Sequence, residues 1–179
     1  MLAYLFVILA VAARVLAGTG TLSLHGFTPL CASLLFFGSR APRKQFWAPV
    51  ALLIGCDIYL NLFRYNMAIT WDQTVIWAWY AAVCFIGLFL RGRVKPLWVG
   101  AAAIGSSASF FVISNFAVWL AGYLAYPKTL AGLSACYVAA IPFFRNDVIS
   151  NLLFSAVFFA IPALIAHTSR ATEQKRATA

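Results

Sequence analysis

Phe46-Trp-Ala-Pro-Val-Ala-Leu-Leu-Ile-Gly-Cys-Asp-Ile-Tyr-Leu-Asn-Leu-Phe63 is an apolar run that contains one charged residue, Asp57, and one amide, Asn61. A helix that crosses a membrane needs about 20 predominantly apolar residues, and this run comes close to that length. Arg43 and Lys44 lie directly before it, where cytoplasmic basic residues flank a span. We therefore expect a transmembrane helix that carries polar side chains at membrane depth.

The composition of the whole chain agrees with this interpretation. Of its 179 residues, 64% are hydrophobic and only 9% are charged, whereas a soluble domain carries about 25% charged residues. This excludes a soluble globular enzyme, and the high hydrophobicity also excludes a disordered chain. We expect one transmembrane helical domain over residues 1–169 and a short polar cytoplasmic tail at 170–179.

Apolar segments recur along the chain and predict the number of spans. The six candidates are Leu2–Ala17, Gly26–Gly38, Phe46–Phe63, Thr74–Leu90, Pro96–Gly122 and Val148–His167. A further stretch, Leu130–Phe144, is short for a crossing, follows Pro127 and has Pro142 near its end. The predicted fold is thus an all-α integral membrane protein with six transmembrane helices, plus a non-crossing helix on the outer side between helices five and six.

The basic residues predict the orientation of these helices. Nine of the thirteen Lys and Arg residues fall on one side if both termini are cytoplasmic, as expected from the positive-inside rule. They are Arg40, Arg43, Lys44, Arg91, Arg93, Lys95, Arg170, Lys175 and Arg176. Because these residues form short clusters between apolar runs, the net charge of +9 reflects topology, and we expect no nucleic-acid partner.

Two ionisable residues stand out inside the apolar segments. Arg14 and Asp57 lie about 17 Å and about 15 Å from the cytoplasmic ends of their predicted helices, at 1.5 Å per residue, so they can pair. Such a pair either fastens two helices together or holds a polar ligand. Arg14 suits a carboxylate or phosphate, because its guanidinium donates two parallel hydrogen bonds.

Other polar and aromatic residues extend this candidate site. Asn61 and Arg64 follow Asp57 at i+4 and i+7, which puts all three on one helical face. Asn115 and Trp119 share a face near the outer end of their helix, as amide and flat ring. The full set of candidate substrate-binding residues is Arg14, Asp57, Asn61, Arg64, Trp71, Trp77, Asn115, Trp119 and Tyr137.

The sequence contains no recognisable catalytic or cofactor motif. The four cysteines occur singly in apolar runs, and the two histidines fall on opposite sides of the predicted membrane. Cys136 is the one cysteine placed to serve as a soft-metal ligand, although buried cysteines ordinarily act as small hydrophobic residues. We therefore expect no enzyme activity, no cofactor and no metal site.

Four stretches carry a resemblance to a known family. They are Gly26-Phe-Thr-Pro-Leu30, Ser114-Asn-Phe-Ala-Val-Trp119, Tyr126-Pro-Lys-Thr-Leu130 and Cys136-Tyr-Val-Ala-Ala-Ile-Pro-Phe-Phe-Arg-Asn146. Together they resemble an uncharacterised bacterial family of six-helix transport proteins, which is similar to the substrate-binding (S) subunits of energy-coupling factor transporters. The resemblance implies the bacterial cytoplasmic membrane, an outward-opening substrate site and a transmembrane coupling subunit with ATPases. It also implies that Ala13 and Ala17, small residues at i and i+4, contact this partner.

These observations leave two functions open. The first is capture of a small, partly polar, vitamin-like nutrient for uptake, either with a coupling subunit or by a solitary transporter. The second is a structural or accessory subunit of a larger membrane complex, in which the polar residues contact neighbouring chains. A cavity among the predicted polar residues favours the first, whereas tight packing of those residues favours the second.

Overall fold

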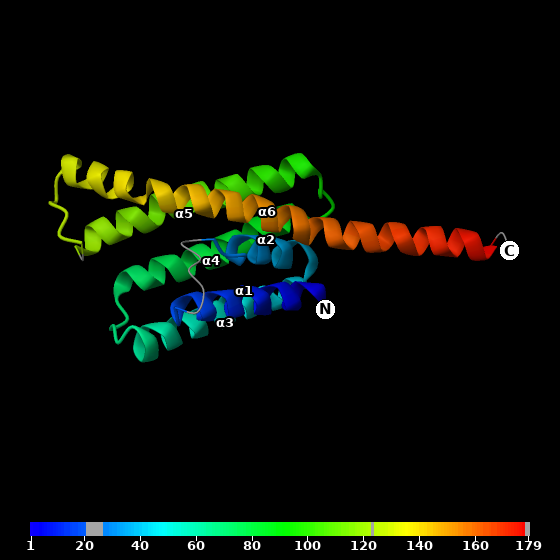
Figure 1. The fold of residues 1–179 in the computed structure, drawn as a ribbon, viewed down its shortest axis with the longest axis horizontal. Coiled ribbons are helices and arrows are strands. Elements are labelled where there is room, and N and C mark those ends of the chain that lie inside the picture. Colours follow the sequence, from blue (N-terminus) through cyan, green and yellow to red (C-terminus); the bar gives the residue numbers. More distant parts are fainter. Residues whose placement is uncertain (21–26, 123, 178–179) are drawn as a thin grey trace.

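The computed structural model describes residues 1–20, 27–122 and 124–177, and all regular structure in these ranges is helical (Figure 1). The α-helices are α1 (Leu2–Gly18), α2 (Leu30–Arg40), α3 (Trp47–Tyr59), α4 (Trp71–Phe89), α5 (Pro96–Ala121) and α6 (Leu130–Ala177). A 3₁₀ turn at Arg43–Gln45 precedes α3, and a π-helix at Leu60–Arg64 extends it. The predicted all-α class is confirmed.

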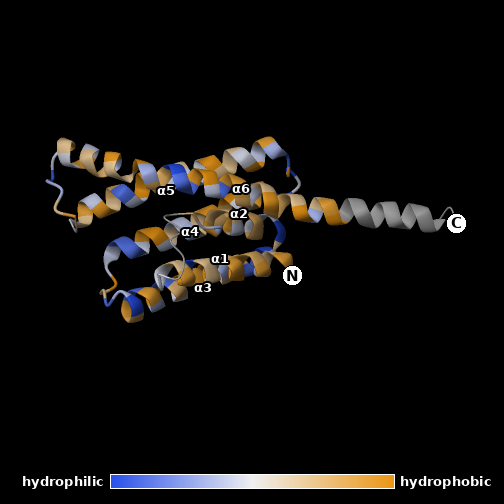
Figure 2. Cartoon of the chain, in the orientation of Figure 1, coloured by the Kyte–Doolittle hydropathy of each residue, from blue (hydrophilic) through white to orange (hydrophobic). Residues whose placement is uncertain are grey.

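Four stretches of helix are long and apolar enough to cross a membrane. They are Arg43–Arg64, Trp71–Phe89, Pro96–Ala121 and Leu130–Ile165. Many large apolar side chains on these helices remain exposed, including Leu97 at 77% and Leu130 at 85% of their maximal accessible area. Figure 2 shows that the helices are mainly hydrophobic, with hydrophilic residues in the connections and in short parts of α3, α4 and α6. The chain is therefore a membrane-embedded helical protein.

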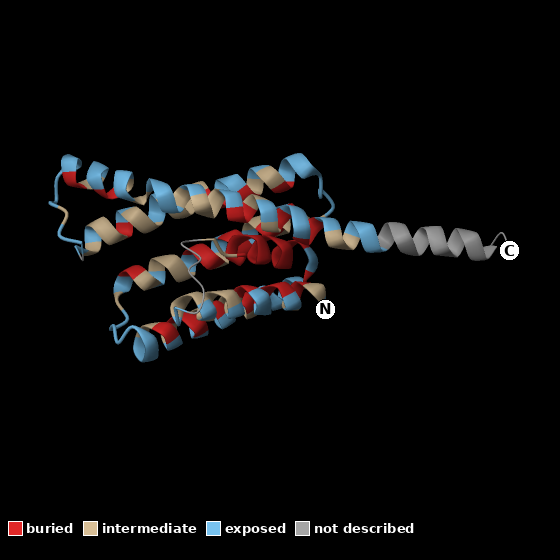
Figure 3. Cartoon of the chain, in the orientation of Figure 1, coloured by how far each residue is buried: buried red, intermediate tan, exposed pale blue. Residues whose placement is uncertain are grey.

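α2 forms the centre of the bundle and is much shorter than its predicted span. It begins only at Leu30, directly after Pro29 at the N-cap position, and its length of 11 residues corresponds to about 16 Å. All its residues from Leu30 to Ser39 are buried, and Figure 3 shows this concentration of buried residues. A helix that is apolar on every side belongs inside a core. α1 is also short, so six crossings remain a prediction.

The prediction of a separate helix at 130–144 is wrong. Residues 130–177 form one continuous helix, α6, with Pro142 and Pro162 inside it. Proline removes one helical hydrogen bond, but in membrane helices neighbouring segments can compensate for this loss. α6 packs along α5, which supplies such a neighbour. The helix also continues through the predicted tail as far as Ala177.

The connections that carry the basic clusters lie at one end of the bundle. Figure 1 shows the N-terminus, the α2–α3 connection, the α4–α5 connection and the far end of α6 on the same side. Residues 40–44 and 91–95 therefore share an end, as the charge pattern predicts. The side chains of the basic tail residues 170, 175 and 176 lie outside the described part of the structure.

Candidate solute-binding site

A cavity of about 540 Å³ lies among α1, α3, α4, α5 and α6, with the start of α2 at its base. Its walls come from the last turns of α1 and α3, the π-helix after α3, the first half of α4, residues 107–115 of α5 and residues 140–147 of α6. The cavity therefore occupies the half of the bundle that lies away from the basic connections (Figure 1). Its volume is within the range of about 300–1,000 Å³ that small-molecule sites occupy.

Asp57 is the most buried charged residue in the cavity wall, with 1% of its area exposed. Its Oδ1 accepts a hydrogen bond from Arg14 Nε at 2.6 Å, which is also an ion pair. Its Oδ2 accepts from Trp77 Nε1 at 3.2 Å and from Tyr80 OH at 3.0 Å. Helices α1 and α4 thus both hold this carboxylate of α3, and its charge is compensated.

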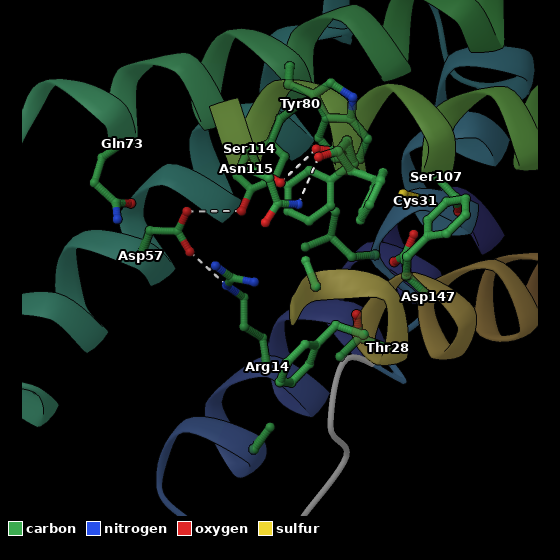
Figure 4. Close-up of a pocket in the computed structure, with 18 of the residues that line it drawn as sticks. Arg14, Thr28, Cys31, Asp57, Gln73, Tyr80, Ser107, Ser114, Asn115 and Asp147 are labelled. Carbon is green, nitrogen blue, oxygen red and sulfur yellow. Dashed lines mark hydrogen bonds and ion pairs between the residues drawn. The ribbon is translucent and has the colours of Figure 1, made fainter. Parts of the chain in front are cut away.

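Arg14 uses only one of its three guanidinium nitrogens to bind Asp57. Its side chain is 34% exposed, and it bonds Asp57 through Nε alone. Within the described part of the chain, the terminal nitrogens of the guanidinium have no hydrogen-bond partner, and Arg14 lines the cavity (Figure 4). These nitrogens are the donors that ordinarily bind carboxylate or phosphate groups.

The π-helix after α3 changes which residues reach the cavity. Asn61 lines it and donates from Nδ2 to the backbone oxygen of Asp57 at 2.9 Å. Arg64 instead donates to the backbone oxygen of Thr19 at 3.3 Å and does not line the cavity. Because a π-turn holds one more residue than an α-turn, the predicted i, i+4, i+7 face fails at Arg64, and Tyr65 lines the cavity instead.

α5 and α6 contribute one helical face each. Ser107, Phe110, Phe111, Ser114 and Asn115 line the cavity from α5, while Ala140, Phe143, Phe144 and Asp147 line it from α6. Both sets follow the spacing of three and four residues that defines one side of a helix. The predicted Asn115 is therefore present in the same cavity as Arg14, Asp57 and Asn61.

Three of the predicted aromatic residues form hydrogen bonds that join parts of the helix bundle, and they do not line the cavity. Trp77 donates to Asp57, as described above. Trp119 Nε1 donates to the backbone oxygen of Pro127 at 3.0 Å, which ties the end of α5 to the α5–α6 connection. Tyr137 OH donates to the backbone oxygen of Val112 at 2.8 Å, which joins α6 to α5. Trp71 is exposed at the start of α4 and is likewise not part of the wall.

The two alanines of the predicted partner-binding pair, Ala13 and Ala17, differ in their position relative to the cavity. Ala17 lines the cavity, whereas Ala13, one turn earlier on α1, does not. Both are partly buried. A partner contact at this pair therefore stays a prediction.

Tyr80 and Asp147 are site residues that the sequence interpretation missed. Tyr80 shares a face with Trp77 at i+3, and this spacing was the available signal for a joint contact with Asp57. Asp147 directly precedes the predicted span Val148–His167, and an acidic residue is favourable at a helix N-terminus, so the sequence indicates an ordinary structural role for it. α6 starts 17 residues earlier, at Leu130, so Asp147 is in the middle of a helix and its carboxylate needs another explanation.

The described residues contain no group of three His, Cys, Asp or Glu side chains arranged to hold a metal ion. The four cysteines are buried and unpaired by disulfides. Only Cys31 among them lines the cavity. The chemistry of the site therefore comes from Arg14, the two carboxylates and the polar and aromatic side chains around them.

Comparisons with curated proteins and with solved structures give no significant match. A family's sequence profile matches residues 1–174, which is nearly the whole chain. The chain therefore belongs to DUF6580, a family of unknown function.

Proposed function

We propose that this protein captures a small, partly polar solute in the cavity, as the first step of its uptake across the bacterial cytoplasmic membrane. The observation that carries this proposal is that the terminal nitrogens of the Arg14 guanidinium are available for a ligand. Its terminal nitrogens face a cavity of about 540 Å³ and bind no other described group. A polar donor at membrane depth is costly unless a partner meets it, and a carboxylate or phosphate on the solute is a suitable partner.

The rest of the wall favours a solute that contains a ring. Phe110 and Phe111 of α5 and Phe143 and Phe144 of α6 line the cavity. The rings of Phe111 and Phe144 lie with their centroids 4.7 Å apart. Aromatic walls with a few convergent polar groups are typical of small-molecule sites, and a vitamin-like compound combines these two properties.

The location of the cavity supports capture from outside. It lies in the half of the bundle away from the basic connections, and basic connections are typically cytoplasmic. The sequence lacks a phosphate-binding loop, so the energy for transport must come from another chain or from a gradient. The resemblance to S subunits makes a transmembrane coupling subunit with ATPases the proposed partner.

The alternative, a structural or accessory subunit, predicts that the polar residues of α1, α3 and α5 pack tightly together. Arg14, Asp57, Asn61 and Asn115 instead border the same cavity. This arrangement supports solute binding.

The test compares the small molecules that copurify with three proteins, namely the wild-type protein and two variants. Small molecules are extracted from the purified wild-type protein and from R14Q and identified by mass spectrometry, with R43Q as a control for loss of an exposed arginine outside the cavity. We expect a compound that is enriched with the wild-type protein and R43Q and lost from R14Q. Equal enrichment in all three, or a stoichiometric partner protein with no small molecule, contradicts the proposal.

A further inference from the structure

Asp147 is half-buried and presents a second carboxylate to the cavity. It lies on α6, and Figure 4 shows it with Ser107 and Cys31 on the opposite side of the cavity from the Arg14–Asp57 pair. Its Oδ2 is buried and has no hydrogen-bond partner among the described residues. A buried carboxylate oxygen that lacks a donor is unfavourable, because it has lost the hydrogen bonds of water without replacement.

The charges of the wall do not balance. In the described part of the chain, three charged residues line the cavity, namely Arg14, Asp57 and Asp147. Arg14 and Asp57 form an ion pair at 2.6 Å, so their charges compensate each other. Among the described residues of the wall Asp147 has no cationic partner, and a buried unpaired charge is costly until a counter-charge arrives.

A hydrogen-bond network between α5 and α6 lies close to the Asp147 side chain. Ser107 of α5 lies near this carboxylate in the cavity wall (Figure 4). Asn151, one turn further along α6, donates from Nδ2 to Ser107 Oγ at 3.2 Å and to the backbone oxygen of Ala103 at 2.8 Å. Ser155 Oγ in turn donates to Asn151 Oδ1 at 3.4 Å. The network satisfies the amide of Asn151, and Oδ2 of Asp147 remains without a donor among the described residues.

We propose that Asp147 binds a protonated amine of the solute, so that the cavity selects compounds with a basic nitrogen attached to an aromatic or apolar body. This inference rests on the proposed function and names the substrate class of the same site. The ammonium donates to Oδ2 and supplies the missing positive charge, while the four phenylalanine rings of α5 and α6 contact the body of the solute. A solute that also carries an acidic group places that group at Arg14.

The test uses three probes that differ in one functional group: 4-methylbenzylamine, 4-methylbenzoate and 4-methylbenzyl alcohol. Their binding to the full-length protein in detergent is measured by calorimetry. The variant D147N removes the charge of Asp147 and keeps its shape. D72N is the matched control, because Asp72 is a buried aspartate at the start of α4 that does not line the cavity.

We expect the wild-type protein and D72N to bind the amine more tightly than the alcohol. D147N should weaken amine binding by at least about tenfold, since a charge-assisted hydrogen bond contributes about 1.5 kcal/mol or more. Binding of the alcohol should stay within about twofold, a difference of about 0.4 kcal/mol.

Different results overturn different parts of the proposal. Equal amine affinity in D147N and the wild-type protein overturns the role of Asp147. Binding of the alcohol or the benzoate by the wild-type protein, without preference for the amine, overturns the substrate class and leaves solute capture standing. Failure of all three probes to bind the wild-type protein counts against solute capture itself. The wild-type preference between amine and alcohol decides the question even if D147N does not fold.

Discussion

Gly38 of α2 and Gly87 of α4 meet where the backbones of the two helices are in contact. A Cβ atom added to Gly87 would lie 2.5 Å from the backbone oxygen of Leu35 and 2.9 Å from the Cα of Gly38. Real Cβ atoms do not approach backbone atoms this closely. Small residues allow such close packing of membrane helices, and here they allow α4 to cover the buried helix at the centre of the fold.

We predict that G87A lowers the free energy of unfolding by about 2 kcal/mol, because overpacking a close contact forces the backbone to shift. G105A is the control, since a Cβ at Gly105 of α5 meets no atom within 4 Å. There alanine should be neutral or stabilising, as it is in exposed helix positions. Thermal unfolding in detergent measures both variants. Equal effects at the two glycines would show that the α2–α4 contact is not tight.

The buried ion pair should matter most when one member is lost. We predict that D57A destabilises the protein by about 3 kcal/mol, because it strands the Arg14 charge. The same change leaves the donors of Trp77 and Tyr80 without their acceptor. Unfolding in a denaturing detergent, followed by circular dichroism, measures the loss.

Replacing both members of the pair should be milder than removing one. The double variant R14M/D57L places apolar side chains at both positions and leaves no unpaired charge, although the donors of Trp77 and Tyr80 still lose their acceptor. We expect it to be more stable than D57A, which makes the two sites strongly non-additive. A double variant as unstable as the sum of R14M and D57L alone refutes the coupling.

Trp119 should affect the α5–α6 connection and leave solute affinity unchanged. Its Nε1 donates to Pro127, and Lys128 Nζ lies 5.1 Å from its ring centroid. We predict that W119F destabilises the protein by about 1 kcal/mol, the contribution of one hydrogen bond. It should also raise amide exchange in residues 124–129. Solute affinity that falls about tenfold (about 1.4 kcal/mol) without faster exchange would restore Trp119 to the binding site.

Sequence patterns identify the long helices well, because an apolar run has few alternatives in a membrane. The Arg14–Asp57 pair was also predictable, since isolated charges at equal depth attract each other. The short length and central position of α2 were not predictable, because a fully buried helix and a membrane span have the same apolar composition. Asp147 was missed for a related reason: the prolines around residues 130–144 indicated a break, and packing against α5 keeps α6 continuous.

The π-helix at Leu60–Arg64 provides a last prediction, because one extra residue there explains why Tyr65 reaches the cavity. Leu62 is an exposed leucine in this segment. Its deletion should convert the segment to an α-helix, which moves the tyrosine to the position seven residues after Asp57, on the same helical face. We therefore expect the deletion to keep solute binding and to leave the melting temperature unchanged or higher.

Leu52 offers the matched control, since it is an equally exposed leucine in the regular part of the same helix. Deleting it rotates one part of α3 against the other by about 100°, the turn per residue of an α-helix. This rotation separates Asp57 from Arg14 and the two aromatic donors of α4, so we expect loss of both solute binding and stability. If deletion of Leu62 proves as damaging as deletion of Leu52, the π-turn is a required part of the site and not an accommodated extra residue.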